Sequence, residues 1–144
     1  ETVVQKMLKS SSNFMANQIL IALGASVYGP PGTLIKGVSA VVDYAKNKLR
    51  LKNIKIVEGS GVSRQNRISA LEMLTILKQF KPYRYLLKRK DNVLYKTGSL
   101  KGVRTKVGYV GGYPRGPYYF VVFFNRRNSD MNAAINCVKK AIAH

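Results

Sequence analysis

The segment Tyr118–Phe124 consists of seven consecutive aromatic or β-branched residues, and it constrains the fold more than any other part of the sequence. Such residues favour the strand conformation, and a strand without a polar side is normally covered on both faces. We therefore predict a strand at Tyr118–Asn125 in the middle of a sheet. The segments Val93–Lys96 and Arg104–Val110 also have strand periodicity, and Gly111–Gly116 should form the turn before the last strand.

Helical periodicity dominates the rest of the chain. Apolar residues at helical spacing predict helices near Val3–Leu8, at Phe14–Leu23 with Gly24 as its end, and at Thr33–Leu49, Ala70–Phe80 and Asp130–Ala143. Ser69 and Glu72 have the spacing of a capping box at the start of the fourth helix. A short strand at Ile54–Val57 should lead into the glycine-rich loop Glu58–Arg64. The expected fold class is α/β (α+β), with an antiparallel sheet of at least three C-terminal strands and flanking helices.

Length and composition limit the possible classes of protein. The chain has 144 residues, which is the usual size of one domain. It begins at Glu1 and its first methionine is Met7, so we expect it to be a piece of a longer protein. The single cysteine, Cys137, excludes an internal disulfide and a cysteine-based zinc site, and we expect it to be a small buried group of the last helix.

The chain is strongly basic. Its 25 lysines and arginines against 6 acidic residues give a formal charge of +19, which favours anionic partners. The basic residues crowd most between Lys78 and Lys90, where Tyr83 and Tyr85 lie among them. Interleaved basic and aromatic residues occur in nucleic-acid-binding proteins. A solvated basic face of a protein that works at an anionic surface explains the same pattern, and we expect no specific nucleic-acid recognition.

Two short motifs carry groups suited to acyl-transfer chemistry. Lys96 and Thr97 can hold a substrate carboxylate, and Gly98 lets a substrate backbone lie close to the strand edge. Ser11 offers a hydroxyl for proton relay, and the Asn13 amide can donate and accept hydrogen bonds. Lys-Thr-Gly and Ser-x-Asn are two of the three motifs of penicillin-recognising serine enzymes. Each is weak evidence alone. A basic strand can contain Lys-Thr-Gly by chance, and Ser-x-Asn is weaker still because it can simply be a helix cap.

Three blocks of sequence carry a family resemblance. Met7–Ala16, Glu58–Ser69 and Tyr95–Val103 resemble, in this order, the D-alanyl-D-alanine carboxypeptidase/endopeptidase family of the penicillin-binding protein 4 type, over its C-terminal half only. The resemblance implies a partial penicillin-binding/β-lactamase-like transpeptidase fold, in which residues 1–144 are the C-terminal portion of the carboxypeptidase domain. It also implies a serine-type carboxypeptidase in the periplasm or another extracytoplasmic place, which works without a metal or an organic cofactor. Its substrates would be peptidoglycan peptides ending in D-Ala-D-Ala, and the same chemistry would allow endopeptidase cleavage.

The resemblance assigns roles to the residues of both motifs. Ser11, Asn13 and Lys96 would be catalytic, and Thr97, Gly98 and Ser99 would bind substrate. Ser99 would give its backbone N–H to the oxyanion hole and its hydroxyl to the substrate carboxylate. Family members often have aspartate between the serine and the asparagine, whereas Ser12 is present here. The middle side chain is usually not the reacting group, so this difference leaves the assignment in place.

The third family motif is missing from the sequence. None of the ten serines is followed by lysine three positions later, so the chain has no Ser-x-x-Lys nucleophile. We predict that the chain alone is inactive and forms no adduct with β-lactams, which mimic the substrate. The family's last strand pairs with an N-terminal strand that is also missing here, so Tyr118–Phe124 would be an apolar edge that pairs with another segment or chain. The alternative function is a non-catalytic basic module that binds anionic polymer or nucleic acid.

Overall fold

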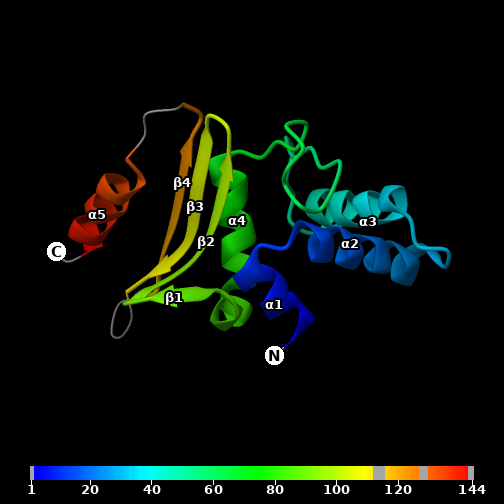
Figure 1. Ribbon diagram of the computed structural model, residues 1–144, viewed down its shortest axis with the longest axis horizontal. Coiled ribbons are helices and arrows are strands. Elements are labelled where there is room, and N and C mark those ends of the chain that lie inside the picture. Colours follow the sequence, from blue (N-terminus) through cyan, green and yellow to red (C-terminus); the bar gives the residue numbers. More distant parts are fainter. Residues whose placement is uncertain (1, 112–115, 127–129, 143–144) are drawn as a thin grey trace. The chain divides into compact units, whose positions relative to one another are not determined.

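The computed structural model describes residues 2–111, 116–126 and 130–142 (Figure 1). The chain divides into two compact units, Glu1–Glu72 and Met73–His144. The first unit is mainly helical, and the second contains the sheet (Figure 1). In the part of the chain that the structure describes, no helix has the length and apolar character needed to cross a membrane.

The first unit contains three helices that begin at side-chain caps. They are α1 (Val3–Ser10), α2 (Asn13–Tyr28) and α3 (Leu34–Asn47). The side-chain oxygens of Thr2, Ser12 and Thr33 each accept a hydrogen bond of 3.2 Å from the backbone N–H three residues later. These bonds satisfy N–H groups that have no partner within the helix, so the sequence sets all three helix starts.

Helix α2 is longer than predicted, and Gly24 lies inside it. The helix ends at Tyr28, before Gly29, which has a φ of 77°. A Cβ atom on Gly24 would lie 2.4 Å from the backbone N of Gly37, and a Cβ on Gly37 would lie 2.1 Å from the carbonyl oxygen of Leu20. The prediction that Gly24 ends the helix is therefore wrong. This glycine permits the close crossing of α2 and α3, and such a contact cannot be read from one helix alone.

The close crossing predicts a specific loss of stability. Gly37→Ala should lower the free energy of unfolding by about 2 kcal/mol, because the new methyl group forces α2 and α3 apart. Ser39→Ala is the matched control, since Ser39 is an exposed residue of the same helix. Urea unfolding of both variants measures the difference. If Gly37→Ala unfolds at the same urea concentration as the unchanged chain, the two helices are not in tight contact.

The segment between α3 and α4 (Ala70–Phe80) has little regular structure. The strand predicted at Ile54–Val57 is wrong, because only Lys55 forms a β-bridge there, with Arg67. The capping box is confirmed: Ser69 Oγ accepts from the Glu72 backbone N (3.2 Å), and Glu72 Oε2 accepts from the Ser69 backbone N (3.1 Å). Hydrogen bonds from the backbones of Asn53 and Ser69 hold the pKa of Glu72 below its ordinary value.

The second unit is a four-stranded antiparallel sheet in the order β1-β2-β3-β4, with α4 on one face and α5 on the other (Figure 1). A 3-10 helix, η1 (Lys81–Leu86), follows α4; the later elements are β1 (Lys88–Lys90), β2 (Val93–Leu100), β3 (Val103–Val110), β4 (Tyr118–Phe124) and α5 (Met131–Ile142). The predicted antiparallel sheet with flanking helices is confirmed. Ala143 and residues 112–115 of the predicted turn lie outside the described residues.

Both faces of the sheet carry core contacts. Toward α5, Val93, Val110 and Phe120 of the strands pack with Ile135. On the opposite face Tyr109 is only 1% exposed, and its hydroxyl donates a 2.6 Å hydrogen bond to the carbonyl oxygen of Leu77 in α4. Burial, with a smaller effect of Tyr119, raises the pKa of Tyr109 to about 12. This bond fixes α4 against the sheet.

Strand β4 differs from the prediction in its place in the sheet. It is the outer strand, and among the described residues it pairs with β3 alone. Phe120 is buried, whereas the other six residues of the strand are half-buried. The expectation of a strand in the middle of the sheet is therefore wrong for the described sheet. An apolar strand sequence shows that both faces are covered, and it says nothing of which edges are paired.

Candidate active site

The Lys-Thr-Gly motif lies within a strand. Strand β2 continues to Leu100, beyond the predicted end at Lys96, so Lys96-Thr97-Gly98-Ser99 is part of its regular structure. In the ladder with β3, Lys96 lies opposite Val107, Gly98 opposite Thr105 and Ser99 opposite Arg104. A strand held by a ladder positions side chains more rigidly than a loop does.

The other edge of β2 is open at the motif. Strand β1 pairs only with Val93, Leu94 and Tyr95 of β2. From Thr97 to Leu100, this edge forms no ladder with another strand among the described residues. Unpaired backbone N–H and C=O groups at a strand edge can bind an extended peptide as an added strand. The motif therefore lies where a peptide backbone could bind.

Lys96 is half-buried on β2, and its Nζ donates a 2.8 Å hydrogen bond to the carbonyl oxygen of Thr97. Burial, followed by the charge of Lys88, holds the pKa of Lys96 below its ordinary value. A lowered pKa makes the ammonium a better proton donor. Thr97 and Ser99 are exposed, so their hydroxyl groups are accessible beside this ammonium.

The packing of β2 against β3 gives a second reason for a glycine at position 98, besides the predicted close approach of a substrate backbone. A Cβ atom at this position would lie 2.6 Å from Oγ1 of Thr105 on β3. The same hydroxyl donates a 3.5 Å hydrogen bond to the carbonyl oxygen of Gly98. The absence of a side chain thus preserves a contact between the two strands.

The Ser-x-Asn motif lies at the junction of α1 and α2. Ser11 ends α1 in the left-handed conformation (φ 55°, ψ 42°), and Asn13 is the first residue of α2. Both are exposed. The helix cap is the middle residue, Ser12, whose hydroxyl accepts from the backbone N of Met15. Aspartate and serine are both favoured caps, so a serine at position 12 can start the helix as an aspartate would.

The residues of each motif lie close together within one of the two compact units. Ser11 and Asn13 belong to the first compact unit, and Lys96, Thr97, Gly98 and Ser99 to the second. The structure brings the first pair together at one helix junction and the other four on one strand.

Glu58 organises the glycine-rich loop, a role that the sequence reasoning missed. Its carboxylate accepts hydrogen bonds from the backbone N of Ser60 (2.7 Å), Gly61 (2.9 Å) and Ser63 (3.1 Å), from the Ser60 hydroxyl and from Asn66 Nδ2 (2.5 Å). Burial raises the pKa of Glu58, but the hydrogen bonds from Ser60, Ser63 and Asn66 outweigh this effect and lower it overall. The sequence shows an acidic residue directly before Gly-Ser-Gly, but it does not show which groups this carboxylate binds.

The same loop is attached to α2. The backbone N of Gly59 donates a 2.8 Å hydrogen bond to Oδ1 of Asn17. A Cβ atom on Gly59 would lie 2.8 Å from the carbonyl oxygen of Ala16. Asn17 is one helical turn after Asn13, so the loop supports the part of α2 that carries the Ser-x-Asn motif.

Metal-binding groups are not evident in the part of the chain that the structure describes, where no three His, Cys, Asp or Glu side chains gather. Cys137 is exposed on α5, so the expectation of a buried cysteine is wrong.

Comparison with family models and known proteins shows which proteins this chain is similar to. The model of the D-Ala-D-Ala carboxypeptidase 3 (S13) family matches residues 1–88, and that of the beta-lactamase enzyme family matches residues 47–143. D-alanyl-D-alanine carboxypeptidase DacB of Haemophilus influenzae is 27% identical over 154 residues, which cover 85% of this chain and 31% of that protein.

Solved structures show the same relationship. The crystal structure of penicillin binding protein 4 from Haemophilus influenzae, complexed with a novel beta-lactam, has a TM-score of 0.79 at 25% identity and covers 90% of this chain and 36% of that one. A second crystal structure of that protein has a TM-score of 0.75 at 25% identity, over 90% and 34% of the two chains. The chain thus spans about a third of the length of these relatives. Because a family model matches more than half of its residues, the chain belongs to the D-Ala-D-Ala carboxypeptidase 3 (S13) family.

Proposed function

We propose that this chain is the C-terminal part of a serine-type D-alanyl-D-alanine carboxypeptidase that acts on peptidoglycan stem peptides outside the cytoplasmic membrane. The observation that carries the proposal is the edge of β2 at Thr97–Ser99, which forms no ladder with β1 and lies beside the Lys96 ammonium and two exposed hydroxyl groups. We call the longer protein the parent protein. Endopeptidase cleavage of cross-linked peptides uses the same chemistry and belongs to the same proposal.

The residues of both motifs have distinct roles in this reaction. Lys96, Thr97 and Ser99 hold the free carboxylate of the D-Ala-D-Ala end, and the Ser99 backbone N–H stabilises the oxyanion. Ser11 relays a proton to the leaving D-alanine, and Asn13 orients the substrate amide. The nucleophilic serine of a Ser-x-x-Lys segment elsewhere in the parent protein forms the acyl-enzyme, which water then hydrolyses.

Intact mass after incubation with a β-lactam tests the proposal. The 144-residue chain should form no covalent adduct, because it has no Ser-x-x-Lys nucleophile. The parent protein should gain the mass of one β-lactam. A stoichiometric adduct on the chain alone would show that it has its own nucleophile. If the parent protein has no Ser-x-x-Lys and forms no adduct, the carboxypeptidase proposal is wrong and a non-catalytic basic module is favoured.

We also propose that the outer edge of β4 pairs with another segment of the parent protein or with another chain. Every second N–H of β4 points away from β3 and should exchange rapidly with solvent in the isolated chain. The same amides should exchange much more slowly in the parent protein. Hydrogen exchange with residue resolution measures the difference, and the amides that bond β3 are the internal control. Strong protection of the outer amides in a monomeric sample of the chain would contradict this pairing.

A further inference from the structure

A cavity of about 310 Å³ lies between the sheet and α5 in the second unit. This volume equals that of about ten water molecules and is at the lower end of the range for small-ligand sites. The residues that line it are Lys90, Asp91, Val93, Tyr95, Lys106, Asn132, Ile135, Asn136 and Lys139. Helix α5 and the sheet contribute different polar groups to this cavity.

Helix α5 turns one face toward this cavity. Asn132, Asn136 and Lys139 are spaced at i, i+4 and i+7, which places them on one side of the helix. Ile135, between them, is buried in the core that joins α5 to the sheet. The helix therefore provides two amides and one ammonium above an apolar floor.

The sheet provides two further ammonium groups, those of Lys90 on β1 and Lys106 on β3. Lys106 Nζ lies 4.3 Å from the centre of the Tyr95 ring, which holds it over the aromatic face. Burial lowers the pKa of Lys106, and the charges of Lys139 and Lys90 lower it further. The three ammonium groups thus repel one another at this cavity, which is a cost unless an anion offsets it.

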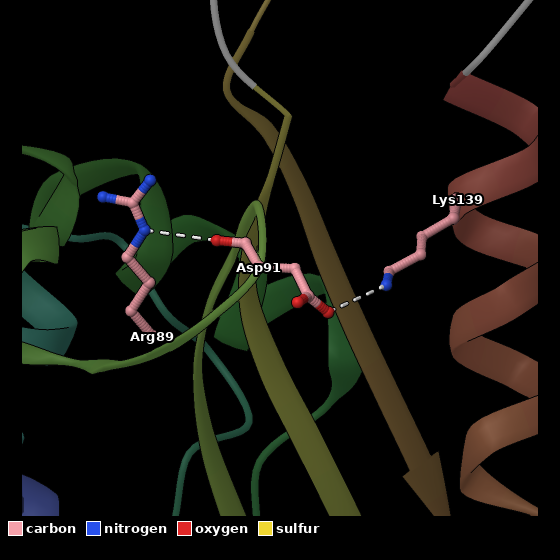
Figure 2. Close-up of polar contacts among 3 residues, drawn as sticks. All are labelled: Arg89, Asp91 and Lys139. Carbon is pink, nitrogen blue, oxygen red and sulfur yellow. Dashed lines mark hydrogen bonds and ion pairs between the residues drawn. The ribbon is translucent and has the colours of Figure 1, made fainter.

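Asp91 is the single carboxylate among the described residues that line the cavity. It lies in the turn between β1 and β2, and its Oδ2 is 3.9 Å from Nζ of Lys139 (Figure 2). The neighbouring Arg89 does not line the cavity, and its Nε donates a 3.2 Å hydrogen bond to the carbonyl oxygen of Asp91 (Figure 2). Three ammonium groups and one carboxylate leave the cavity with two unbalanced positive charges.

We propose that this cavity binds a phosphate or pyrophosphate group. Lysine ammoniums act as point charges that suit phosphate, and the two asparagine amides add donors that a compact anion can share. A phosphate dianion would balance the excess charge. The site is separate from the Lys-Thr-Gly motif, because Tyr95 and Lys96 are adjacent on β2 and point to opposite faces of the sheet. The proposal does not depend on the carboxypeptidase activity.

Titration of the 144-residue chain with pyrophosphate at constant ionic strength tests this site, with binding measured by calorimetry. Lys106→Gln and Lys139→Gln should each weaken binding about tenfold, which is the loss expected for one charge-assisted hydrogen bond. Lys140→Gln is the matched control, because Lys140 is an exposed neighbour on α5 that does not line the cavity. It removes the same charge and should leave binding unchanged.

The outcomes separate a defined site from general attraction to a basic protein. Equal weakening by all three variants, or no binding at all, would overturn the proposal. Circular dichroism checks the fold of each variant, and Lys139→Gln alone carries the test if Lys106→Gln does not fold, since the Lys139 side chain is 39% exposed.

A vesicle experiment identifies the source of the phosphate. Vesicles of phosphatidic acid in phosphatidylcholine are compared with pure phosphatidylcholine by cosedimentation. If Lys106→Gln and Lys139→Gln reduce vesicle binding more than Lys140→Gln does, the ligand is a lipid headgroup. If only pyrophosphate distinguishes the variants, the ligand is soluble. If neither probe distinguishes them, the site does not exist.

Discussion

Replacing Lys96 by alanine in the parent protein is expected to slow acylation by a β-lactam about 10³-fold. The loss combines an electrostatic contact to the substrate carboxylate with a contribution to proton transfer, and each alone is worth about 10²-fold or more. Lys96 suits both roles because it is half-buried and burial lowers its pKa. The second-order rate constant for labelling by a fluorescent penicillin measures the effect.

Lys78→Ala is the control for this experiment. Lys78 is exposed in the last turn of α4, so its removal changes the net charge and leaves the site intact. Thermal unfolding of both variants should stay close to that of the unchanged protein, since Lys96 makes a surface hydrogen bond with Thr97. If Lys96→Ala is acylated at the normal rate, this lysine has no part in the reaction.

Replacing Glu58 by alanine is expected to lower the free energy of unfolding of the chain by about 3 kcal/mol. Three backbone N–H groups, the Ser60 hydroxyl and the Asn66 amide lose their acceptor, and water replaces part of these hydrogen bonds in a half-exposed loop. Urea denaturation measures the change. Glu58→Gln keeps the size and one carbonyl acceptor, so its loss should be smaller.

The stability contributed by Glu58 should also depend on pH. Its pKa in the folded chain is below the ordinary value of 4.5, so the ionised group stabilises the fold at pH values above about 4.5. This contribution is lost as the pH falls through the lowered pKa. The difference in stability between the unchanged chain and Glu58→Gln should therefore shrink on acidification from neutral pH. A difference that stays constant would show that the carboxylate charge contributes nothing.

Sequence reasoning succeeds where the determinants are local. The capping box at Ser69 and Glu72 gives the start of α4, because both partners lie within one helical turn. It fails for Gly24, whose role depends on Gly37 in another helix. It also misses β1, which consists of three exposed basic residues and has no alternation of polar and apolar side chains. Its pairing with β2 follows from the turn at Asp91, which has a φ of 53°.

The candidate site also contains features that the sequence reveals and features that it does not. The motifs that contain Ser11, Asn13 and Lys96–Ser99 are visible as residue types in order, and their catalytic roles stay predictions. The role of Glu58 could not be read from the sequence, because most of its donors are backbone N–H groups, which every residue except proline has. Only the path of the loop shows that they converge on one carboxylate.

The hydrogen bond between Gly59 and Asn17 joins the second family block to the residue that directly follows the first block, 42 positions away in the sequence. It implies that these blocks cannot be exchanged independently between relatives. A recombinant that takes the N-terminal helices from one family member and the loop from another must inherit a matching pair at these two positions. The crossover points that preserve function should therefore lie before Asn17 or after Gly59, and not between them.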